Sequence, residues 1–206
     1  FAVAKKMLYE RPDLLQKILD INVCSVSQYL QLQIDSGAQA VMIFDTWGGL
    51  LTTEDYLKYS LEPMSCIIRE IRADSKNNDI PIIVFTKGGG LWLRNIAQAG
   101  AEVLGIDWTI SLSRAREEID QAFDKRIAIQ GNLDPSILLS NQQEIEKRVQ
   151  QCFEDLSSVA LKEGNPLDGH IFNLGHGISQ LTPPENVATL VAMVRQYSAA
   201  LRTIKV

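Results

Sequence analysis

The sequence predicts an α/β fold: about five β/α units of a parallel eight-stranded barrel, that is, a partial (β/α)8 TIM-type barrel. Five short apolar runs are each followed by a polar or glycine-rich cluster, and each cluster leads towards a helix-like stretch. The runs are mostly continuous rather than alternating, as expected for parallel strands covered on both faces. Side chains that follow the strands of such a barrel converge on one mouth, so functional residues are sought in these clusters.

The first two units are read from helical spacing followed by an apolar run. We expect a helix at residues 22–36, a strand at 40–44, a helix from Thr52 or Thr53 to about residue 74, and a strand at 81–85. The first helix is predicted from apolar residues on one face, namely Val23, Val26, Leu30 and Ile34. Gly37 then stands where a helix C′ residue would.

The later units repeat the same order. The expected elements are a short helix at 91–100, a strand at 103–106, a helix at 114–123, a strand at 127–129, a helix from Ser140 to about residue 156, a strand at 170–173 and a last helix that begins at two prolines after Thr182. Ser140 with Gln143 three residues later predicts a capping box. The helix that it opens places Ile145, Val149, Cys152, Phe153 and Leu156 on one face. The last helix carries an apolar stripe of Val187, Leu190, Val191 and Val194.

Length favours a partial barrel. Five units in 206 residues average about 41 residues each, so a closed barrel built this way needs about 330, within the range of that fold. An open doubly wound sheet is the rival fold, but it should carry a G-x-G-x-x-G fingerprint near its first turn, and none occurs. The chain lacks an initiator Met and begins inside a helical pattern. We therefore expect residues 1–206 to be the C-terminal part of one barrel domain whose N-terminal units are missing.

Composition limits the partners. A net charge of −5 disfavours broad nucleic-acid binding, and no apolar run approaches the roughly 18 residues of a membrane helix. The three cysteines, Cys24, Cys66 and Cys152, form no CxxC pair and have no His at ligand spacing, which predicts buried free thiols and no metal site. We expect a cytoplasmic protein.

The strand endings carry a family resemblance. The segments 37–49, 85–89, 105–108, 130–135 and 173–177 resemble, in this order, the uroporphyrinogen decarboxylase family. The resemblance implies a (β/α)8 enzyme without a cofactor, usually a homodimer. Its reaction is the decarboxylation of the four acetate side chains of uroporphyrinogen III, a tetrapyrrole, to coproporphyrinogen III in haem biosynthesis.

The resemblance also implies site residues. Thr46 matches the family's substrate-contacting Ser/Thr, and His176, in the sequence Asn-Leu-Gly-His-Gly, matches its substrate-contacting histidine. The family's catalytic aspartate, its carboxylate-binding arginines and a tyrosine match no residue of this chain. Second-tier pocket candidates at the strand ends are Phe44, Asp45, Lys87 and Asp107. Ser179 and Gln180 depart from the family pattern, so we expect a different loop shape beside His176.

Three alternatives stay open at this point. Lys87 could form a Schiff base as in an aldolase, and Gly88–Gly90 could cradle a phosphate on backbone N–H groups. The chain alone could also be an inactive, non-enzymatic fragment.

The two site residues have structural alternatives as well. Thr46 could merely cap a turn and His176 could be a loop-bonded structural residue. Glycines on both sides of His176 are expected to let a flat macrocycle approach the backbone.

Overall fold

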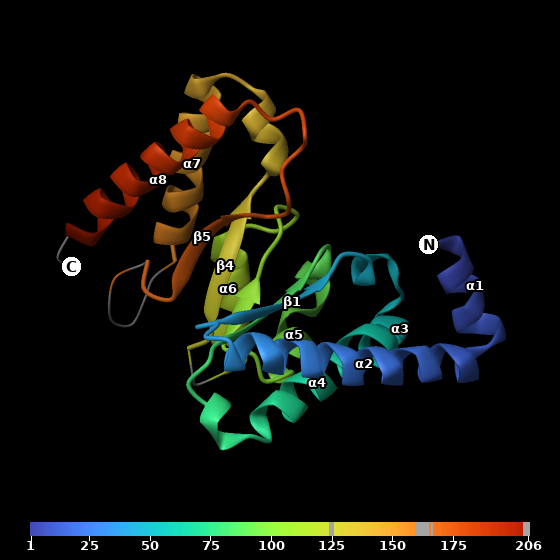
Figure 1. The fold of residues 1–206 in the computed structure, drawn as a ribbon. Coiled ribbons are helices and arrows are strands. Elements are labelled where there is room, and N and C mark those ends of the chain that lie inside the picture. Colours follow the sequence, from blue (N-terminus) through green and yellow to red (C-terminus); the bar gives the residue numbers. More distant parts are fainter. Residues whose placement is uncertain (124–125, 160–164, 166, 204–206) are drawn as a thin grey trace.

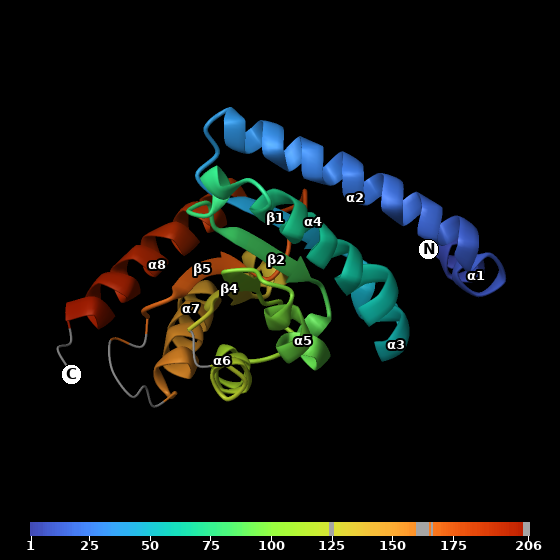
Figure 2. The same ribbon diagram turned by 90° about the horizontal axis from the view of Figure 1, so that it is seen from below.

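The computed structural model describes residues 1–123, 126–159, 165 and 167–203. Its centre is a curved sheet of five parallel strands in the order β1-β2-β3-β4-β5, with helices around its outer side (Figures 1 and 2). The strands are β1 (Val41–Asp45), β2 (Ile82–Thr86), β3 (Val103–Gly105), β4 (Ala128–Leu133) and β5 (His170–Leu174). All five expected strands are confirmed.

Helices precede and connect the strands. They are α1 (Ala2–Glu10), α2 (Pro12–Asp35), α3 (Thr53–Tyr56), α4 (Glu62–Arg72), α5 (Leu93–Gln98), α6 (Leu112–Asp120), α7 (Gln142–Ser157) and α8 (Pro184–Thr203). Short 3₁₀ helices lie in the connections: η1 (Gly48–Leu50), η3 (Ser75–Asn77), η4 (Gly89–Trp92) and η5 (Pro135–Leu139). The first helix, α1, and the last, α8, lie on opposite sides of the molecule (Figure 1).

Three helix predictions need correction. The helix expected at residues 22–36 is longer: α2 begins at Pro12, where proline suits the first helical turn. The long helix expected at 52–74 is interrupted by a π-helical turn, η2 (Leu57–Leu61), which ends just before Pro63. Proline has no N–H to donate and its ring crowds the carbonyl four residues back, so the regular α-helical ladder cannot run through this position.

The capping box at Ser140 is also wrong. The Asn141 side chain accepts from the Glu144 N–H at 2.9 Å, so α7 begins one residue later than expected. The Ser140 hydroxyl instead donates to the Ile137 carbonyl at 2.6 Å and closes η5. Ser140 thus caps the C-terminal end of η5 and not, as the sequence spacing predicts, the N-terminal end of α7.

Register explains how the two faces of the sheet differ. One row across the strands comprises Ile43, Val84, Leu104, Ile129 and His170, and its apolar members are buried under the helices. The next row comprises Phe44, Phe85, Gly105, Gln130 and Ile171 and faces the concave inner side. Phe44 is 67% exposed, so the expectation that strands are covered on both faces is wrong for β1.

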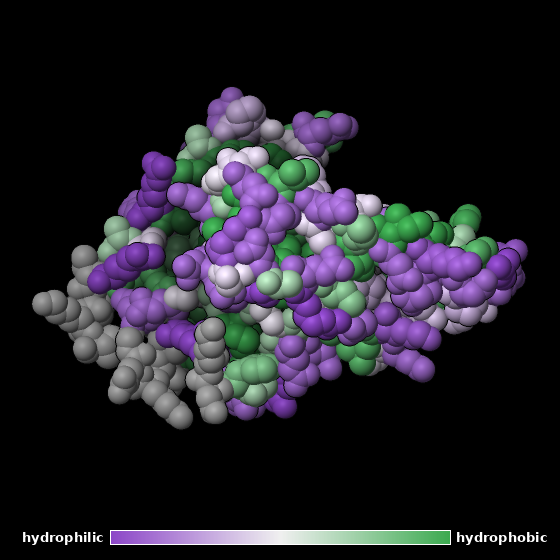
Figure 3. All heavy atoms as spheres, turned by 60° about the horizontal axis from the view of Figure 1, so that its bottom comes forward, coloured by the Kyte–Doolittle hydropathy of each residue, from purple (hydrophilic) through white to green (hydrophobic). Residues whose placement is uncertain are grey.

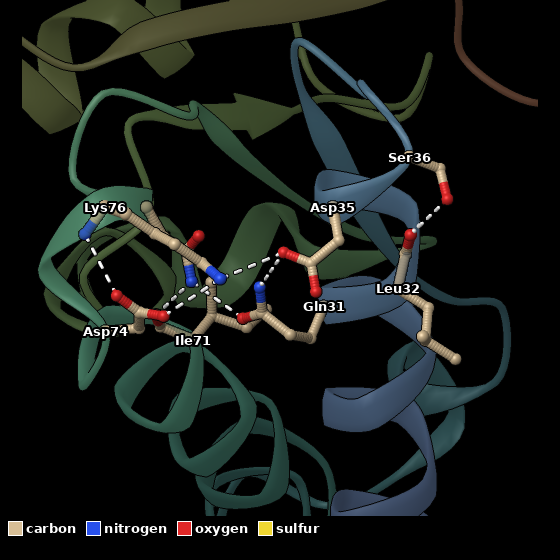
Figure 4. A network of polar contacts seen from close by, with 8 residues as sticks. Gln31, Leu32, Asp35, Ser36, Ile71, Asp74 and Lys76 are labelled. Carbon is tan, nitrogen blue, oxygen red and sulfur yellow. Dashed lines mark hydrogen bonds and ion pairs between the residues drawn. The ribbon is translucent and has the colours of Figure 1, made fainter.

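Polar contacts hold α2 to the rest of the domain (Figure 4). Gln31 and Asp35 on α2 face the turn that contains Lys76 and Asn77: the Asn77 amide donates to Gln31 at 2.7 Å, and Lys76 pairs with Asp35 at 3.1 Å. The outer side of α2 carries exposed apolar residues, namely Ile18, Ile21, Tyr29 and Leu32. Figure 3 shows hydrophobic surface beside hydrophilic side chains on the extension at its right, which α1 and α2 form.

The apolar faces expected for the other helices are largely as predicted. Ile145, Val149, Phe153 and Leu156 of α7 are buried against the sheet. On α8, however, Val191 is 44% exposed. The buried polar residue of that helix, Asn186, donates to the carbonyls of Leu138 and Ser140 at 2.9 and 2.8 Å and so ties α8 to the end of η5. The expectation of buried thiols is wrong for Cys24, which is exposed, and holds only in part for Cys66 and Cys152, which are half-buried.

Among the described residues no helix is both long and apolar enough to cross a membrane.

Candidate site at the carboxyl ends of the strands

A cavity of about 370 Å³ lies on the inner face of the sheet, at the carboxyl ends of the strands. Its floor is apolar and consists of Met42, Phe44, Phe85, Ile106 and Leu174. Its polar lining consists of Thr46, Gln130, Asn173 and His176. No carboxylate lines it among the described residues. A flat apolar ring with polar substituents fits this arrangement, because the floor offers dispersion contacts and the rim offers hydrogen bonds.

Thr46 and His176 lie on the same cavity although they belong to the first and last strand endings. Thr46 is exposed directly after β1, and His176 is half-buried directly after β5, with its ring centroid 6.2 Å from that of Phe85. In the described part of the chain neither side chain has a hydrogen-bond partner. Both therefore offer polar groups to a ligand at this mouth.

Phe44 also lines the cavity, whereas Asp45 points to the opposite side. The Asp45 carboxylate accepts from the N–H groups of Trp47 at 3.1 Å and Gly48 at 2.7 Å, and it also accepts from the Ser60 hydroxyl. These bonds fix the loop after β1. Alternation along the strand places neighbouring side chains on opposite faces, which separates Phe44 from Asp45.

Asp107 is likewise a loop anchor. It is 2% exposed and accepts from the Gly88 N–H and from the Thr109 N–H and hydroxyl at 2.9 and 2.5 Å. The Gly88 amide is thus already bound to a carboxylate, so an anion at the triglycine would have to displace Asp107. Gly88 itself has φ +74°, a conformation that favours glycine. The hydrogen bond from Gly88 to Asp107 links the loop after β2 to the loop after β3. It gives no support to the alternative that the triglycine binds a phosphate.

The glycines beside His176 differ from each other. A Cβ on Gly175 would lie 2.8 Å from the Trp108 backbone nitrogen and 3.1 Å from the Asp107 Cα, so glycine is needed there for the close approach of two loops. This packing contact, and not access for a macrocycle, explains Gly175. A Cβ on Gly177 would meet nothing within 4 Å, and this position is open.

Gln130 is a cavity residue that motif reasoning missed. It lies in the inner row of β4, and its amide oxygen is buried without a hydrogen-bond partner in the described structure. The available signal was a polar side chain directly after the apolar residues Ala128 and Ile129 of the strand, because a buried amide normally finds a partner.

The tryptophans take three different places. Trp92 is buried, stacks on Tyr56 with centroids 4.0 Å apart and donates to Thr53 at 3.0 Å. Trp47 stacks on Phe1 at 5.4 Å and lies away from the cavity. Trp108 lines two neighbouring hollows at the mouth.

The larger of those hollows, about 630 Å³, lies between the loop after β3 and α7. Its arginine, Arg148, is paired with Glu144 at 2.9 Å, and burial raises the pKa of its thiol, Cys152, to about 11. Within the described residues it therefore presents neither an unpaired cation nor a reactive thiolate. In the whole described part of the chain, no group of three or more His, Cys, Asp or Glu side chains is placed to hold a metal ion.

Parallel strands, outer helices and a mouth at the carboxyl ends define a protein of the β/α-barrel class. The family model described as uroporphyrinogen decarboxylase (URO-D) matches residues 1–197. The chain belongs to this family, whose fold is the TIM barrel.

Relatives agree with this assignment. Uroporphyrinogen decarboxylase of Ralstonia nicotianae is 50% identical over 203 residues, which are 98% of this chain and 53% of the relative. The enzyme of Ralstonia pickettii is also 50% identical with the same coverage, and that of Herminiimonas arsenicoxydans is 47% identical over 201 residues. The chain thus spans about half the length of the curated relatives that it matches.

Proposed function

We propose that a protein containing this chain removes CO₂ from the four acetate arms of uroporphyrinogen III and yields coproporphyrinogen III. Family membership supports the reaction class. The observation that carries the proposal is the convergence of Thr46 and His176 on one cavity with an apolar floor. These two positions are those that the family resemblance assigns to substrate contact.

The cavity suits this substrate in two ways. Its apolar floor packs against pyrrole rings, and the Thr46 hydroxyl and a His176 ring N–H donate charge-assisted hydrogen bonds to carboxylate arms. Gln130 adds an amide whose oxygen is able to accept from a pyrrole N–H. The protein's contribution is then chiefly to position the reacting arm and to remove water from around it.

The chemistry needs a place for the electron pair of the breaking bond. Protonation of a pyrrole at its α carbon makes the ring cationic; the C–CO₂ bond then breaks, its electron pair enters the ring, and CO₂ leaves. Protonation at the methylene carbon and loss of the first proton restore the pyrrole. The substrate supplies the electron sink that a cofactor supplies elsewhere, in line with the cofactor-free chemistry that the resemblance implies.

The test uses a chimaera in which residues 1–206 of this chain replace the matching segment of the Ralstonia nicotianae relative. We expect it to release CO₂ from uroporphyrinogen III. Thr46→Val and His176→Ala should each lower kcat/KM about 10- to 100-fold, the effect of losing a hydrogen bond to a charged group, and Thr46→Ser should retain most activity.

The matched control is Thr189→Val on α8, whose hydroxyl donates to its own helix at Glu185. It should leave the kinetics unchanged. A folded chimaera that releases no CO₂ would contradict the proposed reaction. Unaltered kinetics in both Thr46→Val and His176→Ala would contradict the assignment of those two residues.

We also infer, from the resemblance, that the complete protein is a homodimer that acts in the cytoplasm. Light scattering on the chimaera should give twice the mass of one chain. A monomeric mass at working concentration would reject the dimer, and recovery in a membrane or periplasmic fraction would reject the location.

A further inference from the structure

A second cavity of about 290 Å³ adjoins the candidate site. The two cavities share His176 and Gly177 in their walls. The remaining wall of the second cavity comes from Lys87, Trp108 and two serines, Ser136 and Ser179, together with apolar residues of η5 and of the loop after β5. We call it the side cavity. Among the described residues, none of those that line it is acidic.

Lys87 is the only charged residue described in the wall of the side cavity. It is half-buried, and its ammonium lies 5.5 Å from the centroid of the Trp108 ring. The described residues provide it with no carboxylate partner. Asp107, close by in the loop after β3, has its oxygens bound to Gly88 and Thr109.

Partial burial without a carboxylate partner is unfavourable for the Lys87 ammonium. A half-buried ammonium is partly desolvated, and a ring face compensates only part of that cost. An anion in the side cavity would restore the lost interaction, and the cavity is large compared with the roughly 30 Å³ that one water occupies.

We propose that the side cavity binds a carboxylate arm of the substrate and that Lys87 is its counterion. This inference rests on the proposed function, because it takes the octacarboxylate macrocycle as the ligand of the adjoining cavity. Because the two cavities adjoin at His176, a macrocycle in the candidate site has an arm within reach of the side cavity. The Ser136 hydroxyl adds a second donor at the rim.

The bound arm is one that does not react. An ammonium paired with the leaving carboxylate would stabilise the charged ground state more than the transition state, in which that charge moves into the ring, and would slow the reaction. A cation that holds a distant arm binds ground state and transition state equally. Lys87 therefore strengthens substrate binding, and its loss should raise KM without changing kcat.

The test is the kinetics of Lys87→Gln in the chimaera with uroporphyrinogen III. We expect KM to rise about tenfold, equivalent to about 1.4 kcal/mol, with kcat within twofold of the unsubstituted chimaera. Lys87→Arg should recover part of the affinity. The matched control is Lys58→Gln, because Lys58 also contacts an aromatic ring, that of Tyr59 at 4.9 Å, but does not line either cavity.

A second measurement needs no variant. Acetylation of the chimaera, read by mass spectrometry, should modify Lys87 slowly when uroporphyrinogen III is bound and rapidly without it, whereas Lys58 should react equally in both samples. Unchanged KM in Lys87→Gln, a loss confined to kcat, or equal labelling of Lys87 with and without substrate would each overturn the subsite. An active chimaera in those cases leaves the proposed reaction standing, whereas a folded chimaera that releases no CO₂ rejects both.

Discussion

The two histidines of the chain lie close together in sequence but in different surroundings. His176 follows β5 and lines the candidate site, whereas His170 begins β5 in the row that faces the helices. The His170 ring contacts Phe153 and Phe172 edge-on, and its Nε2–H donates to the Gly131 carbonyl at 2.9 Å. His170 is therefore structural, as its place at the start of a strand predicts.

His170 should make stability depend on pH. Burial lowers the pKa of its imidazole below the ordinary value of 6.5, so the unfolded chain binds this proton more tightly than the folded chain does. The contribution of the neutral ring is complete above pH 6.5 and is lost as the pH falls towards the lower folded pKa. The free energy of unfolding should therefore decrease below pH 6.5, with a slope of at most about 1.4 kcal/mol per pH unit from this group.

Urea denaturation at pH 7.5 and 5.5 measures the effect. His170→Asn removes the titrating group, so the variant should be less stable at pH 7.5 yet should lose less stability between the two pH values. An identical pH dependence in both proteins would show that the His170 proton is not linked to folding.

At the scale of elements, the connecting loops approach one another closely at glycines. The loop after β1 contacts the loop after β2, where a Cβ on Gly49 would lie 2.1 Å from the Lys87 carbonyl oxygen. The loop after β5 contacts the loop after β3 at Gly175 and Trp108. These contacts fix the relative positions of the loops at the mouth. They involve backbone atoms, which cannot rotate away as the end of a flexible side chain can.

Gly175→Ala should therefore be destabilising. The new methyl group would press on the Trp108 backbone, and forced contacts of this kind cost about 1–3 kcal/mol. Gly177→Ala, two residues later in the same loop, meets open space and should change stability by less than about 0.5 kcal/mol. Denaturant midpoints of the two variants decide the matter, and equal midpoints would contradict the loop contact.

At the scale of the whole molecule, β1 and β5 lie at the two edges of the sheet, and among the described residues each pairs with one strand. Unpaired backbone groups on an exposed edge favour association with another strand. The inner face is also open at β1, where Phe44 is exposed. Both features suit a sheet that further strands close into a barrel, and we propose that the remaining length of the family's proteins supplies them.

Hydrogen exchange tests this proposal. In the monomeric chain alone, amides on the outward edges of β1 and β5 should exchange within the fastest class, and the chain should show no decarboxylation. In the chimaera with the Ralstonia nicotianae segment the same amides should be protected, and the denaturant midpoint should be higher, because more apolar surface is buried. Equal exchange at both edges in the two proteins would reject closure of the barrel.

Local pattern alone located the five strands and most of the helices. Apolar runs, helical spacing and turn residues act over a few positions, so Ile43 and Val84 are recognisable as strand residues without their neighbours. The pattern also indicated that Thr46 and His176 belong to strand endings that meet at one mouth. Even so, neighbouring caps compete, and the pattern did not identify Asn141 as the N-cap of α7.

Tertiary structure decided which polar groups at that mouth are available. Register and alternation turn Phe44 towards the cavity and Asp45 away from it, and they bring Gln130 into the inner row. Loop contacts engage Asp107 with Gly88 and leave Lys87 facing the side cavity. These outcomes depend on backbone groups from distant segments, whose approach is set by how the whole sheet curves and packs rather than by any short stretch of sequence.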